Sequence, residues 1–304
     1  MAVFLGRQQL PRLLSTLQNI RNANHIRGEI ISKLQSVITD YDFIVDRWPD
    51  YRALVVRVNP ATAKYRNHLI LETVVHATDC EALETLLQLP EVIDWSARIG
   101  FVGKYPDEMS SVLSVMQKHH RPYHLDKFFD MKVTEKTLKF WPIPNGFKIG
   151  SLTPEQAHLV NSMWSYNGGT HSELYIKELI RKLPSCCLYS REGSLVGYAL
   201  TNHYGYLGVL HILEAHRGKG YAKMIMSHLA GLRLQKMAEI PCNLGHQFIG
   251  KTLRPLNTRL KEHRTSVNKL DLTSTICEHI LKNQNHNVMW EATKVLSTNK
   301  KWRQ

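Results

Sequence analysis

The sequence lacks a long uninterrupted apolar run. No apolar stretch in its 304 residues approaches the roughly 18 residues that a helix needs to cross a bilayer. We therefore predict no insertion into a membrane. Hydrophobic residues make up 43% of the chain and charged residues 21%, which is an ordinary globular balance. A chain of this length can form two domains, each with a buried core.

Cysteine is also scarce, since the five cysteines are too few and too scattered for a disulfide framework. Cys186 and Cys187 are adjacent in an apolar stretch that predicts a strand. Neighbouring strand residues point to opposite faces, so we expect these thiols neither to form a bridge nor to hold one metal ion. The 16 histidines show no spacing typical of a closed Cys/His site, so we predict no metal. A reducing compartment fits this pattern.

Acidic residues are too few to balance the basic ones, and the formal net charge is +13. The excess lies at the two ends: residues 1–28 carry +4 and residues 243–304 carry +7, which leaves +2 for residues 29–242. A basic tail raises the alternative of nucleic-acid binding. Its charges are dispersed, however, and Trp290 and Trp302 do not form a stacking series. We therefore expect no nucleic-acid partner.

The amino-terminal segment combines arginines with leucines and contains no acid before Glu29. Its arginines are Arg7, Arg12, Arg21 and Arg27. An Arg-rich, acid-free amphipathic start resembles a mitochondrial transit peptide. It can equally be the first helix of the domain, and both interpretations hold if the address is not cleaved. We predict a mitochondrial protein.

Hydrophobic periodicity predicts an α/β (α+β) fold for the first half. The expected helices cover 8–20, 29–38 and 79–89, the last with Asp79 as N-cap. The expected strands cover 53–58 and 70–75, and Phe43 begins a further apolar run. Proline and glycine near residues 142–150 mark a boundary.

The second half predicts two helices, three strands and another helix. Thr153 is the expected N-cap of the first helix, with Pro154 in its first turn. The other helices are expected over 172–182 and 220–237, and the strands over 185–189, 194–201 and 206–212. One more strand could start near residue 240, and 274–282 and 288–296 could be helical. The expected domains are 1–145, 146–242 and a divergent basic segment, 243–304.

A basic loop with two glycines follows the third of these strands. The strand ends at Ile212, and the helix begins near Gly220. Backbone N–H groups at a helix N-terminus bind phosphate, and a glycine lets the backbone approach it closely. Arg217 and Lys219 add positive charge. Taken alone, such a loop also fits an ordinary structural turn.

The arrangement Arg-x-x-Gly-x-Ala at residues 217–222, between a strand and a helix, resembles the GNAT acyltransferase superfamily. Two other regions resemble the glycine N-acyltransferase family within it. The matching segments are 45–51 (Val-Asp-Arg-Trp-Pro-Asp-Tyr) with 54–57, and 157–164 with 183–188 and 192–196. They follow the family's order and roughly its spacing.

This resemblance implies transfer of an acyl group from acyl-CoA to the amine of glycine or another amino acid. It implies that the loop binds the pyrophosphate, and that the thioester lies where the fourth and fifth strands splay apart. Acyl-CoA is then a co-substrate, with no separate cofactor, and the chain is expected to be a monomer. The family is typically mitochondrial. The residues expected to bind acyl-CoA are Ile212, Leu213, Arg217, Gly218, Lys219, Gly220, Tyr221 and Ala222.

Acyl transfer to an amine requires a group that accepts a proton. Glycine-conjugating members are thought to use a Glu on the fourth strand, and the matching residue here is Tyr206. A phenol with a reference pKa of about 10 is a poor base at neutral pH. Nearby alternatives are His203, His211 and Glu214. We predict that His211 or a bound water removes the proton, although His211 also fits a half-buried strand residue without a role.

The resemblance ends after residue 242. The family continues with a helix and two strands that close the acceptor side, whereas residues 243–304 are polar and basic. This segment has no Tyr, the residue that many GNAT enzymes use to protonate the leaving thiolate. The alternative prediction is therefore a family member that binds acyl-CoA but catalyses little.

Overall fold

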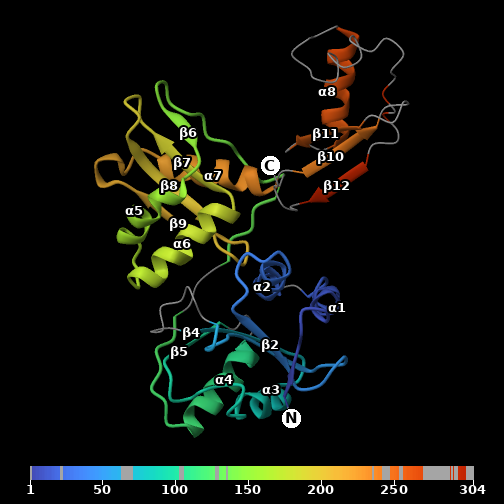
Figure 1. The fold of residues 1–304 in the computed structure, drawn as a ribbon, viewed down its shortest axis with the longest axis vertical. Helices are drawn as coiled ribbons and strands as arrows, with labels where there is room; N and C mark the ends of the chain where they lie inside the picture. Colours follow the sequence, from blue (N-terminus) through green and yellow to red (C-terminus); the bar gives the residue numbers. More distant parts are fainter. Residues whose placement is uncertain are drawn as a thin grey trace.

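A computed structural model describes most of the chain, in three groups of elements (Figure 1). The described residues are 2–20, 23–62, 71–102, 106–126, 130–134, 136–234, 236–241, 247–252, 256–269, 288, 290 and 294–298. No described helix has the length and apolar character needed to cross a membrane.

The first half is a five-stranded sheet with helices on both faces. Its strands follow the chain order: β1 (Val3–Phe4), β2 (Tyr41–Val45), β3 (Ala53–Val58), β4 (Leu71–Ala77) and β5 (Ile99–Val102). Neighbouring strands are antiparallel except for β4 and β5. Its helices are α1 (Leu10–Thr16), α2 (Asn24–Leu34), α3 (Cys80–Leu87) and α4 (Pro106–Lys118).

The alternation of apolar residues in β2 and β3 gives this sheet two buried faces. Phe43 and Val56 pack with α1 and α2, whereas Ile44 and Val55 pack with α3 and α4. The predicted N-cap of α3 is confirmed, because the Asp79 carboxylate accepts a hydrogen bond from the backbone N–H of Ala82 (3.1 Å). The helices predicted over 8–20 and 29–38 are wrong in their bounds. α1 is shorter at both ends, and α2 starts at Asn24.

The second half is a four-stranded antiparallel sheet between two helical layers. Its strands are β6 (Lys148–Gly150), β7 (Ser185–Tyr189), β8 (Leu195–Thr201) and β9 (Leu207–Ile212), paired in that order. α5 (Ala157–Ser162) and α6 (Thr170–Lys182) pack on one face, and α7 (Tyr221–Leu234) packs on the other.

The adjacent cysteines of β7 point to opposite faces, as predicted. Cys186 belongs to the apolar cluster under α7, and Cys187 belongs to the cluster that includes α6. Both thiols are free and fully buried. Burial raises the pKa of the Cys186 thiol to about 12, so this group stays neutral and unreactive.

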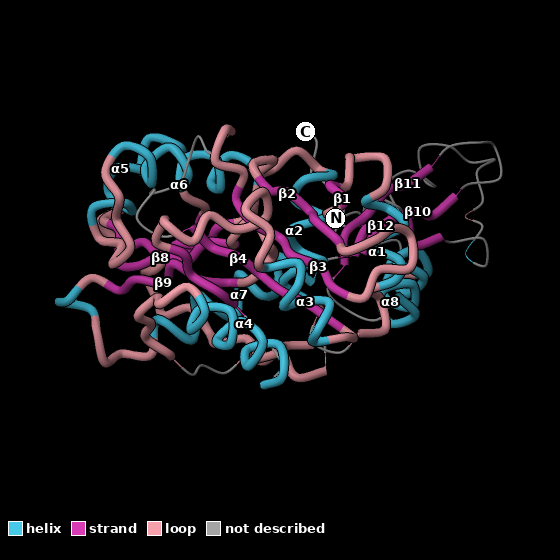
Figure 2. The backbone as a smooth tube through the Cα atoms, turned by 90° about the horizontal axis from the view of Figure 1, so that it is seen from below, coloured by secondary structure: helices cyan, strands magenta, loops and turns pink. Residues whose placement is uncertain are grey.

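The third group contains β10 (Lys236–Pro241), β11 (Gln247–Thr252), β12 (Lys294–Thr298) and α8 (Leu256–Asn268). β10 pairs with β11 and β12 in a separate sheet, whereas β9 is an edge strand of its own sheet. Figures 1 and 2 both place β10–β12 and α8 on the side of the molecule away from β8 and β9. The resemblance implied a fifth strand, after α7, next to the fourth strand. The strand after α7 is β10, and it does not lie beside β9.

Near this group, one predicted helix is confirmed apart from its end, and another is wrong. The helix expected over 220–237 ends at Leu234, because the chain enters β10 at Lys236. The helix expected over 288–296 conflicts with β12, whose residues pair with β10. Pairing with a distant strand overrides local helical periodicity there. The helix expected over 274–282 lies outside the described residues.

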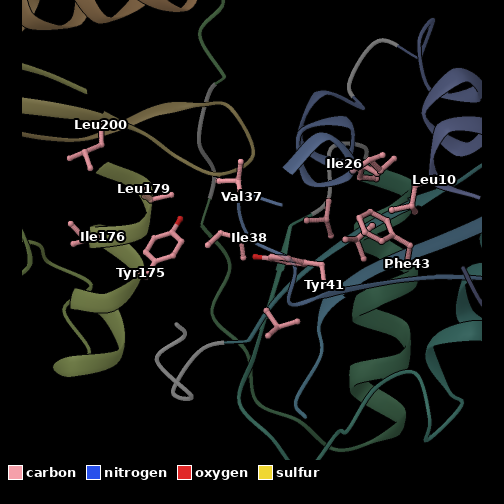
Figure 3. Close-up of a cluster of buried hydrophobic side chains, with 14 of the residues drawn as sticks. Leu10, Ile26, Val37, Ile38, Tyr41, Phe43, Tyr175, Ile176, Leu179 and Leu200 are labelled. Carbon is pink, nitrogen blue, oxygen red and sulfur yellow. The ribbon is translucent and has the colours of Figure 1, made fainter. Parts of the chain in front are cut away.

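The half with the five-stranded sheet and the half with the four-stranded sheet share one apolar core. It runs from α1, α2 and the inner face of the first sheet to α5, α6 and β8. Figure 3 shows Tyr175, Ile176, Leu179 and Leu200 on one side of this core and Val37, Ile38, Tyr41 and Phe43 on the other. The Lys182 ammonium adds a polar link, since it donates to the backbone oxygens of Ser36 (2.7 Å) and Val37 (3.1 Å).

Candidate acyl-CoA site

The loop between β9 and α7 has the backbone shape that a phosphate site needs. A 3-10 turn (Glu214–His216) follows β9, and α7 then begins at Tyr221. Gly218 and Gly220 have φ angles of 75° and 80°, in the left-handed region that disfavours other residues. A Cβ at either glycine would meet no atom within 4 Å. The glycines therefore turn the chain and leave the backbone open on that side.

The N–H groups of this loop are available to a ligand. The first N–H groups of α7 that bond within the backbone are those of Lys223 and Met224, and both donate to the Gly220 oxygen. Among the described residues, the backbone N–H groups of 218–222 have no backbone acceptor. Such donors at the positive end of a helix dipole favour an anion.

The cations of the loop are held by carbonyl groups. The Arg217 Nε donates to the Ile212 oxygen (3.0 Å), and the Lys219 ammonium donates to the Ala215 oxygen (3.2 Å). Both side chains are exposed. A carbonyl leaves their charge uncompensated, so both cations contribute positive potential around the loop.

The other loop residues position the start of α7. The Tyr221 ring packs against Phe147, with ring centroids 5.3 Å apart. Ile212 packs with the cluster under α7, and the Leu213 N–H donates to the Val196 oxygen (3.0 Å). The eight sequence-predicted acyl-CoA residues thus lie at the end of β9, in the loop after it and in the first turn of α7.

A bulge interrupts β9 before the loop. Val209 has a φ of 48°, which is an outlier for a β-branched residue. The β8–β9 register shifts between Tyr198 and Leu200. A bulge leaves backbone polar groups outside the ladder and bends the strand. Sequence analysis did not find this feature, because valine is a favoured strand residue.

His211 lies on β9 next to the end of the strand. It is opposite Tyr198 in the register, and the two rings stack with centroids 5.8 Å apart. Burial lowers the pKa of His211, and the positive charge of Arg217 lowers it further. The imidazole is therefore neutral at pH 7 and can accept a proton.

Tyr206, the other catalytic candidate, is a hydrogen-bond donor here. Its hydroxyl donates to Asp130 Oδ2 (3.0 Å). Burial raises the pKa of this phenol, and the hydrogen bond and charge of Asp130 raise it further. The group is thus no base at neutral pH. Sequence analysis missed Asp130, because it lies in a segment without periodicity.

The two remaining candidates have different surroundings. His203 is buried, and both of its ring nitrogens have protein partners. Glu214 is exposed in the 3-10 turn. His211 is therefore the candidate base with the most suitable surroundings. No group of three or more His, Cys, Asp or Glu side chains that could hold a metal ion occurs in the described part of the chain.

Comparison with known proteins finds a matching family for each half of the chain. A sequence profile described as aralkyl acyl-CoA:amino acid N-acyltransferase matches residues 1–184, and one described as the acetyltransferase (GNAT) family matches residues 155–240. The glycine N-acyltransferase of Bos taurus is 25% identical over 237 residues, which cover 70% of this chain and 76% of the relative. The glycine N-phenylacetyltransferase of Bos taurus is 22% identical over 264 residues, covering 76% and 85%.

A solved structure supports the fold independently. A Drosophila protein from a structural-genomics programme superposes with a TM-score of 0.59 at 15% identity. The match covers 75% of this chain and 84% of that chain. At this identity the similarity concerns the fold alone.

Proposed function

The chain belongs to the aralkyl acyl-CoA:amino acid N-acyltransferase family, and we propose that it transfers an acyl group from acyl-CoA to the amine of glycine or another amino acid. The loop of residues 212–222 carries this proposal, because its free N–H groups and two cations suit a pyrophosphate. The glycine acceptor is supported by similarity to the relatives that act on glycine.

The proposed chemistry uses the loop, β9 and His211. The loop binds the pyrophosphate, and the thioester then extends along β9. His211 or a water takes a proton from the amino group of the acceptor. The amine attacks the thioester carbonyl, so a C–N bond forms as the C–S bond breaks. The CoA thiolate leaves and takes up the proton that the attacking nitrogen loses as the amide forms.

Calorimetric titration with CoA and benzoyl-CoA tests the binding step. We expect binding to the unaltered protein and none to Gly220→Glu, because the new carboxylate repels the pyrophosphate. Gly169→Glu is the matched control. Gly169 also has a positive φ (69°), precedes a helix and has no atom within 4 Å of a Cβ. Equal binding by both variants and the unaltered protein would contradict the loop assignment.

Release of free thiol from benzoyl-CoA, with glycine and then glutamine as acceptor, tests the transfer step. A second candidate function is acyl-CoA binding without efficient transfer. The pairing of β10 with β11 and β12 favours it, because residues 236–241 then form no wall beside β9. Binding without thiol release would support this candidate and contradict the transferase.

We also propose a mitochondrial location, supported by the Arg-rich start and by the family resemblance. Leu10, Leu13 and Leu17 of this segment are fully buried in the shared core. Removing the amino-terminal segment would take these side chains out of the core, so we expect the targeting segment to remain on the mature protein. Mass spectrometry of the protein from purified mitochondria tests this. Absence from mitochondria, or a missing amino-terminal segment, would contradict it.

A further inference from the structure

A charged carboxylate is fully buried where the two halves meet. Glu29 of α2 has no exposed surface. Burial alone raises its pKa, but the charges and hydrogen bonds of His203 and His25 outweigh this and lower the pKa to about 2. Glu29 is therefore ionised at neutral pH. A buried charge persists only where partners compensate it.

Its main partner comes from the other half of the molecule. His203 lies in the β8–β9 turn, and its Nε2 is 3.0 Å from Glu29 Oε1 and 2.9 Å from Oε2. The Tyr41 hydroxyl of β2 also lies 3.1 Å from this nitrogen. The His203 Nδ1 contacts the Tyr175 hydroxyl of α6 at 2.8 Å. Three elements, α2, β2 and α6, thus contact the imidazole of the β8–β9 turn.

The same turn rests directly on the backbone of α2. A Cβ at Gly28 would lie 1.9 Å from the backbone oxygen of Tyr204. No residue larger than glycine therefore fits at this position without moving the turn. One helical turn earlier, the His25 ring stacks on Tyr204 with centroids 4.1 Å apart. α2 therefore forms a seat for the turn, built from His25, Gly28 and Glu29.

The contacts of the β8–β9 turn with α2 determine the position of the first residues of β9. The turn is short, and its ends are tied together by the hydrogen bond from the Asn202 N–H to the Tyr206 oxygen (2.7 Å). The next pair in the ladder is Thr201 with Leu207. A shift of His203 would therefore also shift Tyr206 and the start of β9. The other end of β9 leads into the loop proposed to bind acyl-CoA.

We propose that Glu29 is a positioning residue for acyl transfer, which holds the β8–β9 turn on α2 and so fixes the start of β9 relative to the acyl-CoA loop. The inference rests on the proposed transferase function. Ion pairs of this kind contribute little net stability compared with well-packed apolar residues, whereas their hydrogen bonds impose a defined geometry.

The test compares Glu29→Gln with Glu108→Gln. Glu108 is a matched control, because it is also buried and contacts a buried imidazole (His76, 2.9 Å). Its contact joins α4 to β4 within the first half, away from the β8–β9 turn. For Glu29→Gln we expect unchanged affinity for benzoyl-CoA and a loss in kcat/KM for the acceptor of about 10- to 100-fold, as for a small misplacement of reacting groups. Glu108→Gln should leave both values unchanged.

Gly28→Ala tests the same seat without changing a charge. Alanine favours a helix more than glycine does, so α2 itself is not weakened, while the new Cβ moves the turn. We expect the same selective loss in acceptor kcat/KM, and this variant decides the question if Glu29→Gln does not fold. Normal acceptor kinetics in either folded variant, or equal losses in Glu108→Gln, would overturn the inference.

Failure of the proposed function is seen separately. If the unaltered protein releases no thiol with any acceptor, the transferase proposal fails on that result alone. Positioning is then measured by hydrogen exchange of the backbone amides. We expect faster exchange at residues 203–208 in Gly28→Ala than in the unaltered protein, and unchanged exchange at 203–208 in Glu108→Gln. Equal exchange at 203–208 in all three proteins would overturn the positioning role.

Discussion

At the scale of single residues, the site depends on which side chain accepts a proton. His211 is the candidate whose neighbours favour the neutral form, because burial and the charge of Arg217 both lower its pKa. Tyr206 has the opposite property, since burial and Asp130 raise the pKa of its phenol. The position that the family resemblance assigns to the base is thus occupied by a hydrogen-bond donor, just before β9. His211, the base that we propose, lies near the other end of β9.

His211→Asn should lower kcat about 100-fold or more, as expected when a general base is removed. The unaltered protein should lose activity as the pH falls through the pKa of the imidazole. The variant should lack this acidic limb, because asparagine does not titrate. The measurement is the pH dependence of thiol release at saturating acyl-CoA. Unchanged turnover across the pH range would exclude His211 as the base.

The buried Glu29 makes a prediction about stability and pH. Its pKa is lowered from 4.5 to about 2 in the folded protein. A lowered carboxyl pKa adds stability above the unfolded pKa, and this contribution is lost as the pH falls towards the folded pKa. The full contribution is about 3 kcal/mol. The charged or titratable groups that face Glu29 are His25, His203 and Tyr41.

Urea unfolding of the unaltered protein and of Glu29→Gln measures this contribution. We expect a large difference in the free energy of unfolding at pH 6, which shrinks as the pH is lowered from 4.5 towards 2. Glu108→Gln provides the comparison with another buried Glu–His contact. A difference that stays constant down to pH 3 would show that Glu29 is not ionised in the fold.

At the scale of elements, patterns over a few neighbouring residues predicted helices and strands well. Pairing between distant segments could not be predicted from such patterns. The strand over 53–58 and the Asp79 cap were predictable, because alternation and capping act over a few residues. Residues 288–296 were expected to be helical, but β12 pairs with a strand that lies more than 50 residues away. The contact between Glu29 and His203 joins residues 174 positions apart. No local pattern could have indicated it.

The cap of α3 gives a prediction for one element. Asp79→Ala should cost about 1 kcal/mol in the free energy of unfolding, because the Ala82 N–H loses its acceptor. Asp79 also pairs with Arg52 (2.8 Å), and both side chains are about one third or more exposed. Such exposed pairs contribute little. Asp79→Asn keeps the cap but removes the pair, so it should cost much less. Equal costs in thermal or urea unfolding would assign the effect to the ion pair.

At the scale of the whole molecule, the two halves depend on each other. The loop that we propose to bind acyl-CoA is built by the second half alone, and the resemblance in residues 217–222 predicted its place in the chain. The seat for the β8–β9 turn is built by both halves. A glycine loop can be recognised from the sequence, because its residues are consecutive. A contact between two distant segments, such as that of Glu29 with His203, has no such local pattern.

The shared core predicts how the molecule unfolds. The same apolar cluster contains Phe43 and Ile30 of the first half and Ile176 and Leu200 of the second, so separating the halves would expose it to water. It would also break the contact of the Glu29 carboxylate with the imidazole of His203. We therefore expect residues 2–234 to unfold in one cooperative step, with equal calorimetric and van't Hoff enthalpies.

Weakening the contact between the halves by Glu29→Gln should separate this step into two, whereas Glu108→Gln should lower the midpoint without splitting it. Two transitions in the unaltered protein would show that the halves are independent domains, and that the contact across the joint is too weak to couple them.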